Sequence, residues 1–433
     1  MTHSLSKIQF LLLLCLFFAC RQTGIELTDD IAVIDVINNL GKYREIPVSE
    51  LVTEFEYIPL ETNDNCLIGA VYRMLVTSSH IFIQGYVGGG SPGVILPGGA
   101  TRCYAFGRDG RFLCEIGRVG QGPGEYQNIA GLCVDENNQL LYIESHLTLL
   151  EYTWEGVFRR SIRKPQNLDE YPGSEINFVR DNLFIGHFQN HRGNEPVNFI
   201  LFNDSGRVIK TFDNHIKFER TDNWVSIYDR SMRSFRVSEN IFVKEYPNDT
   251  LFCLNERNEL IPQFVFNLGK YSFSNEKRGG GINEIRNIMS NILMIPDALF
   301  PMIGTPNYIF FSIMVSNADI PSPKVVKSAQ YIQFGLYDIV NKKTLLLEND
   351  PVSRMSGLIN DIDGGFSFWP KYYSLSHELA DVYQAYEMKE ILKEKYFAGR
   401  TIKNPQAHQK LKELVNNLKE DDNPVIVIAK LKQ

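Results

Sequence analysis

The sequence has 433 residues, with 44 Lys and Arg against 51 Asp and Glu, which gives a formal net charge of −7. This acidic balance, without a polybasic run, argues against nucleic acid or an anionic membrane surface as the partner of the folded body. Seven cysteines without a CxxC spacing do not make a disulfide framework in a chain of this length. The length itself suits one large β domain or two domains.

The N-terminus has the pattern of an export signal. Residues 1–7 are polar with one Lys, residues 8–18 form an apolar run, and Ala19-Cys20 follows. The run is shorter than the ~20 apolar residues of a spanning helix. An apolar run, a small residue and a Cys in that order predict a lipoprotein signal peptide over 1–19, with acylation of the Cys20 thiol. Ordinary secretion with cleavage near Ala19 is the alternative.

A lipid on Cys20 would anchor the mature chain in the outer membrane. Residues 20–49 are then a lipid-anchored tether, and the folded body occupies 50–433. In some lipoproteins of this kind, acidic residues directly after the lipidated Cys accompany transfer to the cell surface. Here Arg21 follows, and the first acid is Glu26. This favours the periplasmic side of the membrane, with a surface-facing position as the alternative.

A repeated hairpin indicates the fold class. Two short apolar strands flank a polar turn in residues 74–83, 132–143, 178–185 and 235–243, and in looser copies at 306–315 and 357–369. Asn and Asp in the turns tolerate the left-handed backbone that tight hairpins need. Six such hairpins predict six repeated units.

A second hairpin, rich in aromatic residues, follows most copies of the first. Its turns end at Gly110, Gly156, Gly206, Asn258 and Asn341, and the steps between the three glycines are 46 and 50 residues. Each period therefore holds two hairpins, and four strands per period are typical of a β-propeller blade. Because blades stacked around an axis cover one another's apolar faces, we predict an all-β, six-bladed propeller with four-stranded blades.

The sixth unit has no second hairpin in sequence order. Residues 379–396 and 406–419 have helical spacing, and a last strand follows at 424–432. Residues 51–60 near the N-terminus alternate like a strand too. We predict that the N- and C-terminal strands pair in the last blade and close the ring, with the helices as a C-terminal insertion.

Two segments interrupt the pattern. Residues 86–101 are rich in Gly and Pro and are predicted to form a long flexible loop. Residues 274–301 form an insertion between the fourth and fifth blades, with a weakly helical run at 283–295. Insertions in propellers lie on the faces of the ring, where binding loops are found.

Five cysteines remain after the signal and the anchor, which is an odd count. Cys103 and Cys114 flank a predicted turn symmetrically and could form a disulfide across the hairpin. The alternative, which we favour, is that both are small buried apolar residues.

The segment Gly117-Arg-Val-Gly-Gln-Gly-Pro-Gly-Glu-Tyr126 resembles the six-bladed β-propeller lipoproteins of Gram-negative bacteria, which are similar to NHL-repeat propellers. Stretches at 248–252, 266–271, 360–370 and 420–428 resemble the same family, in the same order. The resemblance covers nearly all of the predicted body and implies the propeller fold. It implies little about activity, because members of this family mostly have no assigned activity.

The Gly-rich and His-containing segments do not form known catalytic motifs. Gly120-Gln-Gly-Pro-Gly124 lacks the Gly-Lys-Ser/Thr ending of a phosphate loop, so a tight connection between blades is predicted instead. His187 and His191 lie in a strand-and-loop region where they need not share a face, and neither a His-Glu-x-x-His motif nor a Gly-x-Ser-x-Gly elbow occurs. We therefore predict no catalytic and no metal-binding residues. Paired carboxylates of a glycoside hydrolase meet only in space, so the sequence leaves that chemistry open.

The turn beginning at Asn360 is the candidate binding site. Asp361 and Asp363 have a spacing that can begin a calcium loop, but the later ligands, including a bidentate Glu, are missing. A structural turn is the alternative that we favour. Trp369 is the aromatic residue to test for sugar or peptide binding, with a core Trp as the alternative. The predicted binding residues are Asn360, Asp361, Asp363 and Trp369, and calcium is the one cofactor considered.

Taken together, these patterns favour a non-catalytic binding or scaffolding protein of the cell envelope. A propeller presents loops on its faces and a channel mouth on its axis, which suit recognition of a protein, peptide or glycan. The alternative is an envelope enzyme, such as a glycan lyase, a hydrolase or a lactonase-like enzyme, with its site at the axis. Converging His, Asp or Glu side chains there would favour the enzyme.

Overall fold

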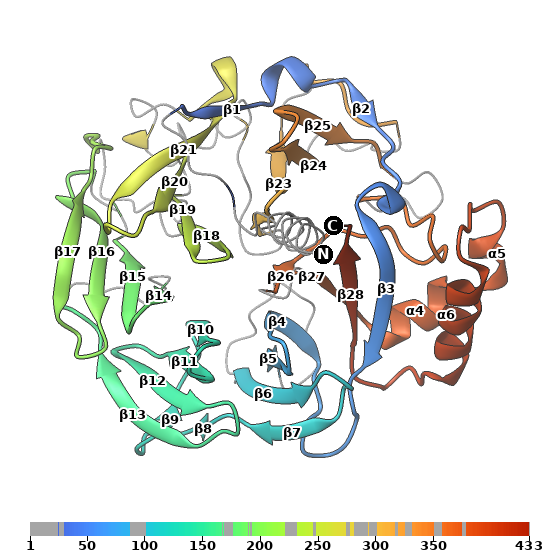
Figure 1. Ribbon diagram of the computed structural model, residues 1–433, viewed down its shortest axis with the longest axis horizontal. Helices are drawn as coiled ribbons and strands as arrows, with labels where there is room; N and C mark the ends of the chain where they lie inside the picture. The colour runs from blue at the N-terminus through green and yellow to red at the C-terminus, as the bar shows by residue number, and fades with distance from the viewer. Residues whose placement is uncertain are drawn as a thin grey trace, which may run out of the picture.

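The computed structural model describes residues 25, 30–86, 101–166, 168, 176–188, 190, 193–220, 232–245, 248–273, 278–280, 293, 301–316, 319–324, 331–349, 357–374 and 378–432. Cys20, His191, most of the Gly-rich loop and most of the insertion at 274–301 lie outside these residues. Six sheets form a ring of blades around a central axis (Figure 1). The prediction of an all-β, six-bladed propeller is confirmed.

The first three blades each contain four antiparallel strands in chain order. Blade 1 contains β4 (Ala70–Val76), β5 (His80–Tyr86), β6 (Thr101–Gly107) and β7 (Phe112–Glu115). Blade 2 contains β10 (Gly131–Asp135), β11 (Leu140–Glu144), β12 (Thr148–Thr153) and β13 (Phe158–Arg163). Blade 3 contains β14 (Ile176–Arg180), β15 (Leu183–His187), β16 (Val197–Asn203) and β17 (Val208–Asp213).

Blades 4 and 5 each gain a fifth, outer strand from the N-terminal segment. Blade 4 contains β18 (Met232–Val237), β19 (Asn240–Glu245), β20 (Thr250–Leu254) and β21 (Leu260–Asn267), and β1 (Ala32–Asp35) pairs parallel with β21. Blade 5 contains β22 (Ile303–Gly304), β23 (Tyr308–Val315), β24 (Tyr331–Asp338) and β25 (Lys343–Leu347), and β2 (Tyr43–Arg44) pairs parallel with β25. Short 3₁₀ turns occur at Ile37–Asn39, Val48–Glu50 and Gly269–Tyr271. Part of the segment predicted as a tether thus packs along the rim of the ring.

Blade 6 joins the two ends of the chain. It contains β26 (Tyr372–Tyr373), β27 (Glu378–Tyr383), β28 (Val425–Leu431) and β3 (Val52–Pro59). Strand β28 pairs antiparallel with β3, with Val425 opposite Pro59 and Leu431 opposite Val52. Figure 1 shows the blue N-terminal strand beside the red C-terminal strand. The predicted closure of the ring by the chain ends is confirmed.

The details of the sixth unit differ from the prediction. Residues 357–369 do not form the inner hairpin, because their described backbone makes two isolated bridges, Leu358 with Phe368 and Ile359 with Pro47, instead of a pair of strands. The inner hairpin is β26–β27, further along the chain, so the helix predicted from residue 379 is wrong as far as Tyr383. The polar turn after Leu358 imitates a hairpin signal, but its side chains bond to other parts of the chain, as described below.

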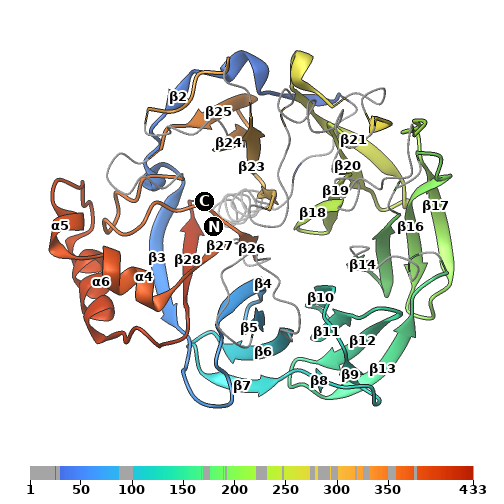
Figure 2. The same cartoon turned by 180° about the vertical axis from the view of Figure 1, so that it is seen from behind.

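The helical insertion packs outside blade 6 (Figure 2). It contains α4 (Ala385–Ile391), α5 (Glu394–Phe397) and α6 (Pro405–Asn417). Helix α6 begins where predicted, because Asn404 caps it by accepting a hydrogen bond from the Ala407 N–H and Pro405 supplies the favoured first-turn residue. Within the described residues, no helix is long and apolar enough to cross a membrane.

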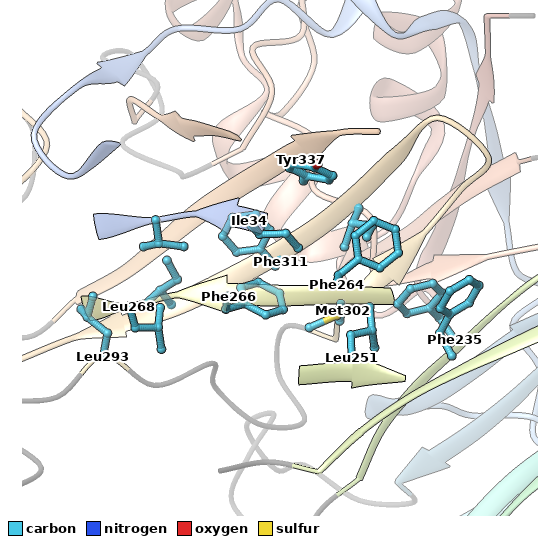
Figure 3. Packing of buried hydrophobic residues seen from close by; sticks show 14 of the residues in the cluster. Ile34, Phe235, Leu251, Phe264, Phe266, Leu268, Leu293, Met302, Phe311 and Tyr337 are labelled. Carbon is cyan, nitrogen blue, oxygen red and sulfur yellow. The ribbon is translucent and has the colours of Figure 1, made fainter. Parts of the chain in front are cut away.

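Apolar side chains from neighbouring blades interdigitate to form the cores. Figure 3 shows the core between blades 4 and 5, where Phe266 of β21 meets Phe311 of β23 edge to face, with ring centroids 5.3 Å apart. Ile34 of β1 is fully buried in the same cluster, so the outer strand contributes to the core as well as to the sheet. Comparable clusters fill other interfaces of the ring, which is why a single blade is not a stable unit.

The two faces of the ring differ in their connections. Since the strands alternate in direction, the second strands of all blades end at one face, where the third strands begin. Second and third strands are joined here through residues 87–100, 188–196, 316–330 and 384–424, of which 384–424 include the helices that pack outside blade 6, and through the shorter stretches 145–147 and 246–249. On the other face, the turns between first and second and between third and fourth strands have two to five residues. We call them the long-connection face and the turn face.

Candidate functional site

The fifth residue of the second strand is buried and polar in five of the six blades. These residues are 1% exposed each: Gln84, Glu144, His187, Lys244 and Ser312. In blade 6 the fifth residue is Val382, and the buried polar residue is Asp381 just before it. Because all second strands end at the long-connection face, the five residues lie beneath that face. We call them the polar belt.

The belt residues extend the apolar interfaces between blades. Side chains two apart on a strand share a face, so Gln84 lies on the same side as Phe82, which packs in the core between blades 1 and 2. The Gln84 amide accordingly donates to the Ile129 carbonyl, 3.0 Å away, in the connection that leads into blade 2. The belt therefore places polar groups at the end of the apolar interface nearest the long-connection face.

Glu144 shows the same arrangement with a charge. Its carboxylate pairs with the Lys164 ammonium at 3.2 Å, and the two side chains are 2% and 0% exposed. Lys164 lies in the connection from blade 2 to blade 3, and its N–H donates to the Leu147 carbonyl at 3.0 Å. Removing one partner of such a buried pair leaves a charge uncompensated, so the pair ties the connection to the blade.

His187 has a different environment. Its Nε2 atom lies 3.9 Å from Oε1 of Glu245, the last residue of β19 in blade 4, and its ring packs against Phe199 at 5.2 Å between centroids. Asn198 of β16 donates to Oε2 of Glu245 at 3.2 Å. An imidazole, a carboxylate and an amide thus meet under the long-connection face, between blades 3 and 4.

The predicted turn residues form a buried hydrogen-bonded cluster between blade 6 and the helical insertion. Asp363 is fully buried, and its carboxylate accepts hydrogen bonds from the Asn360 amide at 2.7 Å, the Gly365 N–H at 2.9 Å and the Tyr57 hydroxyl at 3.0 Å. Burial raises the pKa of Asp363, although these donors oppose the shift. The His408 ring contacts the Asp363 carbonyl at 2.7 Å and so joins the turn to α6.

Asp361 points elsewhere. Its carboxylate accepts hydrogen bonds from the N–H and hydroxyl of Ser49 at 2.9 and 2.6 Å, and pairs with the Lys403 ammonium at 2.8 Å. Burial pushes the pKa of Asp361 upward, but the Lys403 and Ser49 donors outweigh it and hold the pKa below its usual range. Both carboxylates therefore accept hydrogen bonds from distant parts of the chain. Calcium binding here stays a prediction, testable as a calcium-dependent rise in melting temperature that Asp363→Ala abolishes.

Trp369 lies in the core rather than on a surface. It is 4% exposed and packs against Phe334 and Phe310, with ring centroids 4.5 and 5.5 Å away. A ligand could not stack on a ring in this position without opening the interface between blades 5 and 6. The structure thus gives Asn360, Asp361, Asp363 and Trp369 structural contacts, and ligand binding by them stays untested.

The Gly-rich motif is a connection between blades, as predicted. Strands β8 (Arg118–Val119) and β9 (Glu125–Tyr126) pair parallel between blades 1 and 2. The Glu125 carboxylate accepts hydrogen bonds from Arg118 at 2.6 Å and from the Gly122 N–H at 2.8 Å. Gly124 has φ +72°, and a Cβ there would lie 2.6 Å from the Phe158 ring, so both backbone and space require glycine.

Of the two cysteines that could have formed a disulfide, Cys103 is buried and Cys114 is half-buried. Cys103 and Cys114 are free thiols. The register pairs Cys114 with Ala105, so Cys103 lies two residues further along β6 and is not opposite Cys114. Burial raises the pKa of the Cys103 thiol, as expected for a small core residue.

The sequence interpretation missed the polar belt. A usable signal was present, because each belt residue follows an apolar run of the second strand, as in Leu-Leu-Tyr-Ile-Glu144 and Leu-Phe-Ile-Gly-His187. Their partners could not be read in the same way, since Lys164 and Glu245 lie in connections or neighbouring blades. Within the described residues, no group of three His, Cys, Asp or Glu side chains is placed to hold a metal ion.

Comparison with known proteins supports the fold. No curated protein matches the chain. The crystal structure of a "Putative exported protein" from Bacteroides fragilis matches with a TM-score of 0.63 and 16% identity, covering 93% of this chain and 100% of that one. A member of the DUF4221 family from Bacteroides vulgatus matches with a TM-score of 0.48 and 11% identity, covering 90% of this chain and 98% of that one. The family model described as a domain of unknown function, DUF4934, matches residues 31–430, and the chain therefore belongs to that family.

Proposed function

We propose that the protein is a non-catalytic binding or scaffolding propeller of the cell envelope, which recognises a protein, peptide or glycan through its long-connection face. The observation that carries the proposal is the difference between the faces. The turn face has connections of two to five residues, whereas the strand ends at the long-connection face are joined by the longer segments of the chain, one of which is the helical insertion beside blade 6. Loops on a rigid scaffold are where binding surfaces are usually built.

The envelope location rests on separate support. Ala19-Cys20 after an apolar run favours export and acylation of Cys20, and the Bacteroides fragilis neighbour is itself described as exported. A lipid on Cys20 would tether the ring near blades 4 and 5, because Ile25 is buried in the core between them and β1 lies on the outer edge of blade 4. The faces would then stay free for a partner. Incorporation of labelled palmitate by the wild type but not by Cys20→Ala tests the anchor.

Exposed apolar residues allow a test that compares the faces. Tyr72 is 40% exposed and is the extra residue of a β-bulge near the start of β4. Leu147 is 45% exposed and lies in the β11–β12 connection. Both therefore belong to the long-connection face. Val157 and Val340, 61% and 71% exposed, lie in the β12–β13 and β24–β25 turns on the other face. These residues provide matched substitutions on opposite sides of the ring.

The experiment is a capture from envelope extracts, run beside a glycan array, with the mature protein immobilised. Tyr72→Asp with Leu147→Asp should lower retention of the specific ligand at least about tenfold, since a buried charge in an interface costs over 1.4 kcal/mol. Val157→Asp with Val340→Asp should leave retention unchanged. The proposal is wrong if the turn-face variant loses the ligand, or if both variants retain it equally.

One observation favours the second candidate function, an envelope glycan lyase, hydrolase or lactonase-like enzyme. The His187 imidazole lies beside the Glu245 carboxylate, and a carboxylate that orients an imidazole is a common arrangement for general acid–base catalysis. Turnover of a panel of polysaccharides and lactones by the wild type, lost in His187→Ala, would establish the enzyme. Absence of turnover across the panel would leave the binding role as the sole proposal.

A further inference from the structure

Three buried polar side chains meet between blades 3 and 4, and one hydrogen bond joins two of them, from the Asn198 amide to the Glu245 carboxylate. His187, Asn198 and Glu245 are 1%, 8% and 1% exposed. The 3.9 Å from His187 Nε2 to Glu245 Oε1 is too long for a hydrogen bond. Among the residues that the structure describes, neither ring nitrogen of His187 nor Oδ1 of Asn198 has a hydrogen-bond partner.

This arrangement is unfavourable if nothing else occupies it. A buried polar atom without a partner destabilises the fold, and a buried carboxylate does so more strongly unless it is paired or coordinates a metal ion. The nearby Lys244 ammonium donates to the backbone carbonyl of Glu245 at 3.2 Å and lies 6.0 Å from the Phe266 ring. In the described residues, the hydrogen-bond donor to the Glu245 carboxylate is the neutral amide of Asn198.

In Gln84 and Glu144 at least one polar atom of the side chain has a partner, although Gln84 Oε1 has none among the described residues. Gln84 donates to a carbonyl of the next connection, and Glu144 pairs with Lys164. His187 occupies the same strand position, but neither of its ring nitrogens has a hydrogen-bond partner among the described residues. A polar site that departs from the pattern of its own repeat, at the face where the long connections gather, indicates an occupant of its own.

We propose that His187, Glu245 and Asn198 bind a divalent transition-metal ion such as Zn²⁺, a role that does not depend on which function above holds. An imidazole nitrogen and a carboxylate oxygen are ordinary zinc ligands, and an amide oxygen with water can complete the shell. Closing the His187–Glu245 distance from 3.9 Å to the ~3.4 Å between two tetrahedral ligands requires a shift of about half an ångström. Rotation of the Asn198 amide presents Oδ1 in place of Nδ2.

The test uses the mature full-length protein, freed of metal with a chelator and titrated with Zn²⁺ by calorimetry. His187→Gln and Glu245→Gln keep size and polarity, and each should weaken binding at least about tenfold, the loss that even outer-shell changes produce. The matched control is His146→Gln, because His146 is exposed and follows the belt residue Glu144 of blade 2 closely in sequence. Its affinity for Zn²⁺ should equal that of the wild type.

A second measurement needs no variant. Co²⁺ at a site of nitrogen and oxygen ligands gives weak visible bands without a thiolate charge-transfer band, whereas any of the five free cysteines in the described chain would add one. Weak bands that Zn²⁺ displaces support the proposal. Three results would overturn the proposal: a thiolate band, no stoichiometric Zn²⁺ binding by the wild type, or equal losses of Zn²⁺ affinity in His146→Gln and His187→Gln. His187 and Glu245 would then be assigned as a water-bridged pair.

Discussion

Strand β28 should determine whether the ring closes, because it lies between β27 and β3 at the centre of blade 6. Its side chains alternate between two cores: Ile426 and Ile428 face blade 1, whereas Val427 and Ala429 face blade 5. All four are fully buried, and so is Val425. Burying a Val or Ile side chain contributes about 1.5–3 kcal/mol, so the Val and Ile residues of the strand together contribute roughly 6–12 kcal/mol.

That contribution is comparable with the whole stability of a folded domain, about 5–15 kcal/mol. Deletion of residues 423–433 should therefore unfold the propeller as a whole and not only blade 6. Circular dichroism and limited proteolysis of the truncated protein check this result. A truncated chain with a cooperative transition at the wild-type temperature would refute the closure argument.

Single substitutions on the same strand grade the effect. Ile428→Ala should lower the free energy of unfolding by about 3 kcal/mol, because the interface with blade 1 retains the cavity. Lys430→Ala is the matched control, since its ion pair with Glu54, 2.7 Å long, is 45% and 56% exposed and is worth less than about 1 kcal/mol. Denaturant unfolding followed by tryptophan fluorescence measures both variants. Equal losses in the two would show that packing of β28 does not control stability.

Three further outcomes are expected. Asn423→Ala should lower the free energy of unfolding in denaturant by about 3 kcal/mol, because the Asn423 amide bonds three backbone groups of the 60–69 connection at 2.6–2.8 Å. The control, Asn416→Ala at an exposed position, should change it by almost nothing. Similar losses of stability in the two variants would contradict this expectation. Asp363→Asn should lower the free energy of unfolding by less than about 2 kcal/mol and Asp363→Ala by about 3–5 kcal/mol, since only the asparagine side chain keeps an acceptor for the buried donors. Thermal unfolding measures both variants, and the reverse order would refute the role of the acceptor. The pKa of Asp361 is lower in the folded than in the unfolded state, so its contribution to the free energy of unfolding is present above about pH 3.9 and is lost as pH falls through the folded pKa. Lys403→Met should make this loss of stability in acid smaller, by less than about 1 kcal/mol. An unchanged dependence of stability on pH would exclude a contribution from the Asp361–Lys403 pair.

The blades and the ring closure could be predicted because their signals are local. Each hairpin brings its own turn, such as the one before Gly110, and the segments at 51–60 and 424–432 were strands left without neighbours. Pairing of the chain ends then follows from the need to cover open strand edges.

Other elements carry too little local pattern to be predicted. Strands β22 and β26 have two residues each, and no alternation can be read from two residues. The outer strands β1 and β2 depend on edges of blades 4 and 5 that are about 230 and 300 residues away in the chain. The false hairpin at 357–369 arose because Asn360 and Asp363 have turn chemistry that serves Tyr57 and the helices.

The candidate site shows the same division between local and distant information. The sequence placed a polar residue after an apolar strand at Glu144 and at His187, but it could not show which of them finds a partner. The fold brings Lys164 to Glu144 across a single connection, whereas the carboxylate that approaches His187 comes from the second strand of the next blade. The propeller repeat determines where such residues lie on the strand, whereas the residue type at that position varies from blade to blade. A departure from the repeat is therefore more informative about function than the repeat itself, and at His187 the departure is that neither ring nitrogen has a hydrogen-bond partner among the described residues.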